Sequence, residues 1–188
     1  MPDLTRGSPP PVLYLLRPSP WLLWHNYLVQ PGSRVIDLAC GEGRHGLIAA
    51  QWGAEVTGVD RDEEKLEAAR EAADRLGVAV DWRCVDLEGE WPEFGTFDVV
   101  MVFNYLDRNR MGMLKALLAP GGLLIMETFL EWQLALGWGP SSAEHLLRVG
   151  ELALLTSPLE TIHGREVIEP VEGNRIRAVA SIVAQKRQ

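Results

Sequence analysis

Val35-Ile36-Asp37-Leu38-Ala39-Cys40-Gly41-Glu42-Gly43-Arg44-His45-Gly46 is the stretch of this sequence that decides its fold. An apolar run is interrupted by one aspartate and gives way to three closely spaced glycines. This pattern predicts a strand, a tight loop and the first turn of a helix, because glycine admits positive φ and lets a ligand approach the main chain. The N-terminus of such a helix presents unpaired N–H groups. The stretch therefore predicts a cofactor-binding loop.

Two kinds of cofactor use a loop of this kind. The spacing Gly41-x-Gly43-x-x-Gly46, with Asp60 at the end of the next predicted strand, meets the dinucleotide fingerprint, so an NAD-dependent oxidoreductase is one interpretation. Asp37 favours another, because a carboxylate four residues before Gly41 would repel the pyrophosphate of a dinucleotide. A cationic or amino-bearing ligand would be attracted to the same carboxylate.

Strand and helix patterns alternate outward from this loop. Helical spacing predicts helices at 44–52, from an Asp62 cap to Gly77, and at 107–118. Apolar runs predict strands at 34–39, 55–60, 78–85, 97–103 and 123–128. Such alternation implies right-handed crossovers, a parallel sheet and ligands outside the carboxyl ends of the strands.

The beginning of the chain differs from this core. Residues 1–20 are rich in proline and predict an irregular arm that ends at Ser19-Pro20, a helix start. The following residues, 21–28, are apolar and aromatic. They predict a helix that either packs on the sheet or forms a lid over the cofactor site.

The last third of the chain predicts a loop, a helix and a hairpin. Residues 131–140 read as a loop, and Ser141-Ser142-Ala143-Glu144 is a capping-box signature that predicts a helix running to about residue 151 or 155. Residues 159–170 and 175–185 are strand-like and joined by hairpin chemistry. An antiparallel hairpin is not how a dinucleotide fold would end.

The loop also carries a resemblance. Asp37-Leu38-Ala39-Cys40-Gly41-Glu42-Gly43 resembles the acidic-x-x-x-Gly-x-Gly loop of class I S-adenosylmethionine (SAM) methyltransferases. Further stretches resemble the second to fifth strands of that family, namely 53–60, 84–87, 97–100 and 120–125. Within the family the chain is most similar to small tellurite-resistance-type methyltransferases, through Cys-Gly-Glu-Gly-Arg in the loop and Gly173-Asn174-Arg175-Ile176-Arg177 at the last strand.

The resemblance implies one domain over residues 1–188, with an arm and lid helix over 1–30 and a core over 31–188. The implied fold is a Rossmann-like α/β structure with a seven-stranded, mostly parallel sheet, helices on both faces and a C-terminal antiparallel hairpin. The implied cofactor is SAM, and the implied activity is methyl transfer to a small-molecule acceptor. A SAM-binding regulatory protein without catalysis explains the loop equally well and stays open.

The resemblance also implies roles for single residues of the cofactor site. Asp37 would hold the methionine ammonium, directly or through water, and Asp60 would accept hydrogen bonds from both ribose hydroxyls. Asp86 would bind the adenine amino group, and Asn104 would lie near the sulfonium. The expected cofactor-binding residues are Asp37, Leu38, Gly41, Gly43, Asp60, Arg61, Asp86, Leu87 and Asn104.

For the acceptor, we expect a site between the 21–27 helix, Asn104-Tyr105 and the 131–139 loop. The expected substrate-binding residues are Trp24, His25, Tyr105, Trp132 and Arg175. The tellurite-resistance-type enzymes carry a histidine shortly before Gly-Asn-Arg, whereas this chain has Val167 and its neighbours there, so no catalytic residue is assigned. An oxyanion or a thiol would suit such a site, and Arg175 reads either as an anion-steering residue or as a surface charge.

Composition narrows the partners. A net charge of −8 over 188 residues argues against nucleic acid, because phosphate binding needs clustered Lys and Arg. No apolar run approaches the ~20 residues of a spanning helix, and no secretion signal is seen, so we expect a cytoplasmic protein without a membrane partner. Cys40 and Cys84 read as small buried hydrophobes, and no histidine set forms a metal site. The oligomeric state is not indicated.

Overall fold

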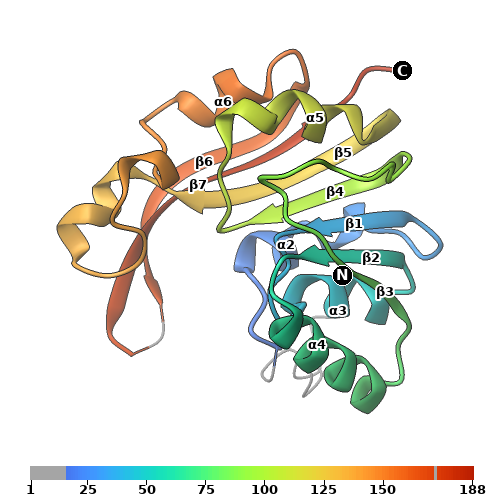
Figure 1. The fold of residues 1–188 in the computed structure, drawn as a ribbon. Helices are drawn as coiled ribbons and strands as arrows, with labels where there is room; N and C mark the ends of the chain where they lie inside the picture. Colours follow the sequence, from blue (N-terminus) through green and yellow to red (C-terminus); the bar gives the residue numbers. More distant parts are fainter. Residues whose placement is uncertain (1–15, 172) are drawn as a thin grey trace, which may run out of the picture.

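The computed structural model describes residues 16–171 and 173–188, and its strands form one seven-stranded sheet of order β3-β2-β1-β4-β5-β7-β6. Strands β1 to β5 pair in parallel, and β7 is antiparallel to both β5 and β6. Figure 1 shows the strands in this order, from the hairpin at the top to β3 at the bottom. The strands are β1 (Arg34–Leu38), β2 (Glu55–Asp60), β3 (Val80–Cys84), β4 (Phe97–Phe103), β5 (Leu118–Phe129), β6 (Glu160–Val171) and β7 (Arg175–Gln185). The predicted sheet and its terminal hairpin are confirmed.

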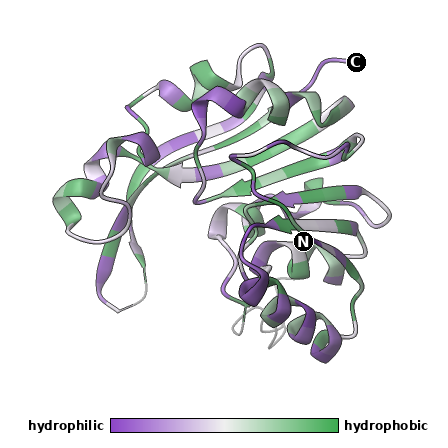
Figure 2. Ribbon diagram, in the orientation of Figure 1, coloured by the Kyte–Doolittle hydropathy of each residue, from purple (hydrophilic) through white to green (hydrophobic). Residues whose placement is uncertain are grey.

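Helices cover both faces of the sheet, because alternate residues of the central strands point to opposite sides. Val35 packs in one core cluster with Trp21 and Ala49, whereas Ile36 packs in another with Leu114. The helices are α2 (Pro20–Trp24), α3 (Arg44–Gln51), α4 (Glu63–Leu76), α5 (Met111–Ala116) and α6 (Glu151–Thr156). Figure 2 shows the apolar central strands and the polar outer side of α4. Among the described residues, none of the helices is long and apolar enough to cross a bilayer.

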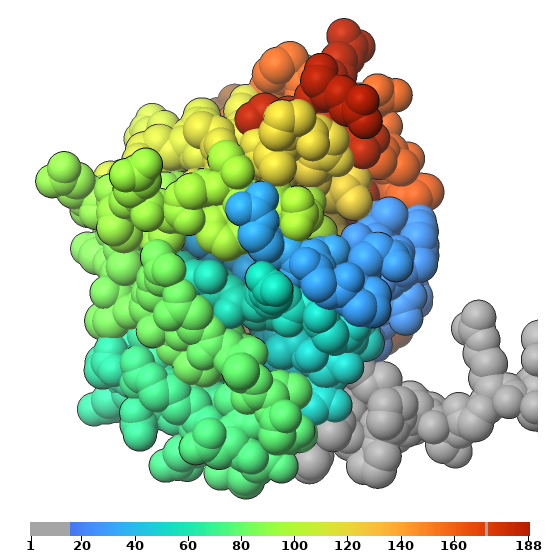
Figure 3. All heavy atoms as spheres, turned by 90° about the vertical axis from the view of Figure 1, so that its right-hand side faces the viewer, coloured from blue at the N-terminus to red at the C-terminus, as the bar shows by residue number. Residues whose placement is uncertain are grey.

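The half of the sheet formed by β1 to β4 agrees closely with the elements predicted from the sequence. Asp62 caps α4 by accepting a hydrogen bond from the Lys65 N–H at 3.3 Å, and Gly77 ends the helix at φ 65°. β2 and β4 have the predicted bounds. Figure 3 shows the right-hand side of the molecule as drawn in Figure 1, where the surface passes from cyan and green residues below to red C-terminal residues above.

The predicted helices at 21–28 and 107–118 are shorter than expected. The first ends at Trp24 and is followed by a 3₁₀ turn, η1 (Asn26–Leu28). The second is divided into η2 (Arg108–Arg110) and α5, and it stops at Ala116 because Leu118 already pairs with Phe97 of β4. Strand β5 therefore begins at Leu118, earlier than the predicted residue 123.

The predicted capping box does not open a long helix. Ser142 caps only a 3₁₀ turn, η4 (Ala143–His145), and α6 starts later, after Gly150 at φ 77°. The reason is a tertiary contact: Leu147 forms a bridge to Leu130 at the end of β5, which draws the chain out of helical geometry. Residues 131–140, predicted as a loop, include the 3₁₀ turn η3 (Glu131–Leu136).

Glu127 of β5 is the centre of a buried polar group that connects three parts of the chain. Its side chain is 1% exposed. Oε1 accepts hydrogen bonds from Ser19 Oγ at 2.7 Å and forms an ion pair with Arg177 Nη1 at 3.0 Å. Oε2 accepts from Ser181 Oγ at 2.8 Å and Arg165 Nη2 at 3.1 Å. The start of α2, β5 and the hairpin are therefore held by one carboxylate.

Glu169 completes this group, which we call the Glu127 cluster (Ser19, Glu127, Arg165, Glu169, Arg177 and Ser181). Glu169 Oε2 pairs with Arg165 Nη1 at 2.7 Å, and Oε1 accepts from Arg177 Nε at 2.9 Å. The Arg165 guanidinium also lies over the ring of Trp24, 4.6 Å from its centroid. Two cations and two carboxylates compensate each other, so the cluster carries no net charge.

Candidate functional site

The loop between β1 and α3 turns sharply at three residues with positive φ. Ala39, Gly41 and Gly43 have φ values of 54°, 56° and 75°. The Cys40 N–H donates to the Val59 carbonyl at 3.0 Å, which fixes the loop against β2. The loop therefore lies across the carboxyl ends of β1 and β2, where the sequence predicted a ligand.

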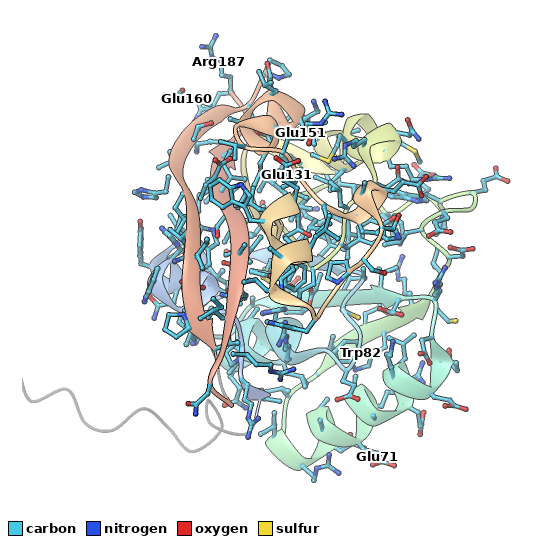
Figure 4. The ribbon with its side chains drawn as sticks, turned by 90° about the vertical axis from the view of Figure 1, so that its left-hand side faces the viewer. Glu71, Trp82, Glu131, Glu151, Glu160 and Arg187 are labelled. Atoms are coloured by element: carbon cyan, nitrogen blue, oxygen red, sulfur yellow. The ribbon has the colours of Figure 1, made fainter. Side chains whose placement is uncertain are left out.

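Gly43 is required by a neighbouring side chain as well as by its φ. A Cβ at this position would overlap with the indole of Trp82, and so would a Cβ on Gly58 of β2. Figure 4, the view onto the carboxyl ends of the strands, shows Trp82 beside α4. These two glycines thus make room for one buried ring edge, which the sequence pattern did not indicate.

Asp60 connects the end of β2 to the glycine loop. Its Oδ2 accepts a hydrogen bond from the Gly41 N–H at 2.7 Å, and its Oδ1 accepts from the Asp62 N–H at 3.0 Å. A carboxylate has about four lone-pair sites, so each oxygen retains the capacity to accept another hydrogen bond. The carboxylate is therefore oriented by the protein and still able to bind a diol.

Asp37 lies under the start of α3 and is 1% exposed. Its Oδ2 accepts a hydrogen bond from the Gly46 N–H at 2.9 Å. Burial raises the pKa of Asp37 to about 7, although the Gly46 N–H and Arg44 act in the opposite direction. A buried carboxylate with a raised pKa favours a nearby positive charge, which suits an ammonium group.

The residues expected around the adenine lie together at the ends of β2 and β3. Leu87 is buried, Asp86 Oδ1 accepts from the Glu88 N–H at 2.9 Å, and Arg61 pairs with Glu88 at 3.6 Å. Arg61 is largely exposed, so this ion pair contributes little to stability. An apolar floor with polar edges results, which fits a planar base.

Two cavities open at the carboxyl ends of the strands and share the lining residues Ala39, Asp60, Lys65 and Asn104. The larger, about 960 Å³, includes Gly41, Arg44, His45 and Phe103; we call it the loop cavity. The smaller, about 420 Å³, is called the β4–β5 cavity, and it is lined by Arg61, Val85, Asp86, Leu87, Glu88, Tyr105, Leu106, Phe129, Pro140 and His145 in addition to the shared residues. Asn104, at φ 57°, stands where the two cavities meet.

Comparison with known proteins agrees with this geometry. A family model described as a methyltransferase domain matches residues 35–122. A ubiquinone biosynthesis O-methyltransferase of Methylocella silvestris is 30% identical over 81% of this chain and 59% of its own length. A ribosomal protein L11 methyltransferase of Ralstonia nicotianae is 40% identical over 60% of this chain and 37% of its own. The structure of TehB from Haemophilus influenzae superposes with a TM-score of 0.74 at 18% identity, covering 88% of this chain and 61% of that one.

The chain has the fold of the class I SAM-dependent methyltransferases, and residues 35–122 match a methyltransferase domain. SAM is the methyl donor of this family. The chain spans between about a third and three fifths of the length of these two curated relatives. Their acceptors differ in kind, since one is named for ubiquinone biosynthesis and the other for a ribosomal protein.

The structure brings the predicted SAM-binding residues together around the shared wall. Gly41 lines the loop cavity, Arg61, Asp86 and Leu87 line the β4–β5 cavity, and Asp60 and Asn104 line both. The other three lie behind this surface. Asp37 and Leu38 are buried in β1, and Gly43 is the N-cap residue of α3.

The predicted acceptor residues do not gather in one place. Tyr105 lines the β4–β5 cavity. Trp24 and Trp132 are 57% and 42% exposed and line neither cavity. His25 is buried, with Nδ1 2.8 Å from the Trp21 carbonyl oxygen, and Arg175 lies over Trp138 at the far end of the hairpin.

Several cavity residues were not singled out by the sequence. His45 follows the glycine loop, stacks on Phe103 and accepts a hydrogen bond from the Ser19 N–H at 3.1 Å. Burial lowers the pKa of His45 well below its usual range, so the ring is neutral and can accept. His145 was hidden inside a predicted helix. Of the cysteines, Cys40 is buried in the loop cavity, but Cys84 is exposed, contrary to expectation.

Proposed function

We propose that this protein transfers the methyl group of SAM to a small-molecule acceptor. The observation that carries the proposal is the shared wall of the two cavities. The loop, Asp60 and the Asp86-Leu87 floor hold the cofactor, and the rest of the β4–β5 cavity of about 420 Å³, lined by Leu106, Phe129, Pro140 and His145, takes a small molecule. The protein substrate named for one relative would need a larger open surface than this cavity provides.

The cofactor fits the chemistry of the residues present. The Asp60 carboxylate accepts hydrogen bonds from the ribose hydroxyls, and Asp37 compensates the ammonium of the methionine part, directly or through water. Leu87 packs against the adenine, and Asp86 accepts from its amino group. With these ends placed, the methionine sulfur lies near Asn104.

The chain's own contribution is chiefly positioning. SAM, when bound, supplies an electrophilic methyl group on a positively charged sulfur. Asn104 and Tyr105 place the acceptor atom on the side of the methyl, and the buried walls exclude water. Holding two reactants at near-attack distance supplies on the order of 7 kcal/mol of the barrier or more.

Two rivals remain distinguishable by experiment. An NAD-dependent oxidoreductase is disfavoured because the sheet ends in an antiparallel hairpin rather than a parallel strand. A SAM-binding regulatory protein would bind the cofactor without turnover. The test has two steps: calorimetric titration with SAM, S-adenosylhomocysteine (SAH) and NAD, followed by transfer of radiolabelled methyl to a panel of small acceptors and to a protein extract.

We expect SAM and SAH to bind, NAD not to bind, and label to appear in small acceptors. Binding of NAD alone would overturn the cofactor assignment. Label found only in protein would overturn the acceptor class, and binding without any transfer would favour the regulatory alternative.

A further inference from the structure

We propose that His145 is the catalytic base for a phenolic acceptor that binds in the β4–β5 cavity. The inference rests on the proposed methyl transfer and adds to it a substrate class and a proton acceptor. It is carried by three observations: the place of His145 in the cavity lining, the apolar residues of the same lining, and the way the chain holds the turn that bears His145.

Beside the adenine floor, the lining of the β4–β5 cavity combines one imidazole with apolar surface. Leu106, Phe129 and Pro140 supply the apolar part, and His145 supplies the titratable group. An aromatic ring is the ligand that such a wall buries well, because Phe129 offers a ring edge or face for stacking. A hydroxyl on that ring is then within the same small space as the imidazole.

Arg108 fixes the turn on both sides of His145. Its Nη1 donates to the Glu144 carbonyl at 2.7 Å, and its Nη2 donates to the Leu146 carbonyl at 2.7 Å. Glu151 holds the guanidinium in a bidentate ion pair, with Nε to Oε1 at 2.6 Å and Nη2 to Oε2 at 2.9 Å. Figure 4 labels Glu151 near the top of the view. Both neighbours of His145 are thus held by one arginine.

A second set of bonds holds the same segment to β5. The Leu147 N–H donates to the Phe129 carbonyl at 2.9 Å, and the Glu131 N–H donates to the Leu147 carbonyl at 2.8 Å. Exposed turns seldom have so many backbone groups fixed by distant partners. Because Arg108 follows Asn104 on the same connection, the imidazole and the shared wall are positioned by one loop.

The chemistry of a phenol requires a base at this place. An ordinary phenol has a pKa near ~10, so it is almost entirely protonated, and a poor nucleophile, at neutral pH. Tyr105 does not serve, since burial raises its pKa to about 12 and keeps its hydroxyl protonated. Histidine titrates near neutral pH and is the usual general base. His145 is also exposed, so a proton taken up there leaves to solvent.

The step balances without a further reactant. The phenol O–H proton passes to an imidazole nitrogen of His145 as the phenol oxygen forms a bond to the methyl carbon. The electron pair of the broken sulfur–carbon bond stays on the sulfur, which becomes neutral. The products are a methyl aryl ether, SAH and a protonated His145, which returns its proton to water.

The experiment uses 4-nitrophenol, whose anion absorbs visible light. The full chain is saturated with SAH and titrated with 4-nitrophenol at a pH below the pKa of the free phenol. We expect the bound probe to show the spectrum of the anion, and we expect His145→Gln to bind the probe in its protonated form. His163→Gln is the matched control, because His163 is exposed on β6 and lines neither cavity.

Turnover gives a second measure. With labelled SAM and a phenolic acceptor, His145→Gln lowers kcat by about 10²- to 10⁴-fold and leaves the SAH dissociation constant within about threefold. Added imidazole partly restores the rate of His145→Ala. Arg108→Lys keeps the positive charge but loses the several N–H donors of the guanidinium. Because Arg108 is a positioning residue, this variant lowers kcat more than it raises KM.

The outcomes separate failure of the His145 inference from failure of the proposed function. If SAH binds but 4-nitrophenol does not, or if His145→Gln still binds the anion, the inference is overturned and the proposed function stands. If SAH itself does not bind, the proposed function fails first. A thermal melt of each variant separates misfolding from loss of the base, and Arg108→Lys keeps the test valid if His145→Gln does not fold.

Discussion

Glu127 and Asp37 are both carboxylates at 1% exposure, yet the protein treats them in opposite ways. Glu127 is met by two arginines and two serine hydroxyls, so its hydrogen-bonding capacity is filled by the chain itself. Asp37 accepts from the Gly46 N–H, and its pKa is raised to about 7 by burial. The difference teaches that a buried carboxylate saturated by protein donors holds the fold, whereas Asp37 has fewer protein donors and, as we propose, compensates the ammonium of a bound cofactor.

The largest effect is expected for Glu127, whose carboxylate is saturated by protein donors. Glu127→Gln keeps the shape but removes the charge that compensates Arg165 and Arg177, so the free energy of unfolding should fall by about 3 to 5 kcal/mol. Urea denaturation measures it. Glu131→Gln, an exposed change on η3, is the control and should stay within about 0.5 kcal/mol of wild type. A loss below about 1 kcal/mol for Glu127→Gln would show that the cluster is not structural.

A smaller effect is expected for Asp60, the carboxylate that we propose binds the ribose. Asp60→Asn should weaken SAH binding at least ~10-fold, because charge-assisted hydrogen bonds contribute roughly 1.5 to 3 kcal/mol each. Asparagine is preferred to alanine because it removes the charge but keeps an acceptor for the Gly41 N–H. Asp62→Asn preserves the α4 cap and should bind SAH within about threefold of wild type. Equal dissociation constants for both variants in calorimetry would make Asp60 a purely structural residue.

The raised pKa of Asp37 gives the comparison a pH dependence. The folded value, about 7, lies above the unfolded value of 3.8, so between these two values the folded form holds a proton that the unfolded chain has lost. This group therefore makes the ligand-free protein less stable as pH rises from about 4 to 7. Asp37→Asn should remove that slope from a series of denaturation curves.

The folded protein without ligand favours protonated Asp37. A bound ammonium reverses this preference, because it favours the ionised carboxylate. SAH affinity of the wild type should then rise about tenfold between pH 6 and pH 8, with release of a proton, and the affinity of Asp37→Asn should stay nearly constant. Calorimetry in two buffers of different ionisation enthalpy counts the proton. A flat profile for the wild type would separate Asp37 from the ammonium.

The smallest effect concerns the aromatic edge of the Glu127 cluster. Trp24→Ala removes the ring under the Arg165 guanidinium, which at an exposed site is worth about 0.5 to 1 kcal/mol of unfolding free energy. SAH affinity should not change, because Trp24 lines neither cavity. Trp132→Ala is the matched control for an exposed indole. A raised KM for the acceptor in Trp24→Ala would instead show that Trp24 contacts the acceptor, as the sequence predicted.

The fold was predictable wherever local signals agreed with the final pairing. The Asp62 cap, Gly77 and the apolar run at 97–103 each act over a few residues, and each element has the expected end. The capping box at Ser142 gives a signal of the same strength, but Leu147 pairs with β5 and overrides it. That partner lies on another element, so no local pattern could reveal it.

The sequence predicted the clustering of the expected cofactor residues better than that of the expected acceptor residues. Strand ends meet at one edge of a parallel sheet, which is enough to bring Asp60, Asp86 and Asn104 together. The tryptophans were assigned to a pocket by their number alone, yet Trp24 packs on a guanidinium. His145 depends on Arg108, whose side chain reaches across two elements, and such a contact has no sequence signature.

The position of β7 between β5 and β6 has a consequence for the chain during its synthesis. β6 leaves the ribosome before β7, but it has no neighbour in the sheet until β7 has paired on both sides. Ser19, 108 residues before Glu127, likewise cannot be held fully until Arg165 and Arg177 have been made. A nascent chain that ends before β7 thus exposes the edge of β5 and leaves α2 without its contacts to the hairpin, a form prone to pairing with other chains.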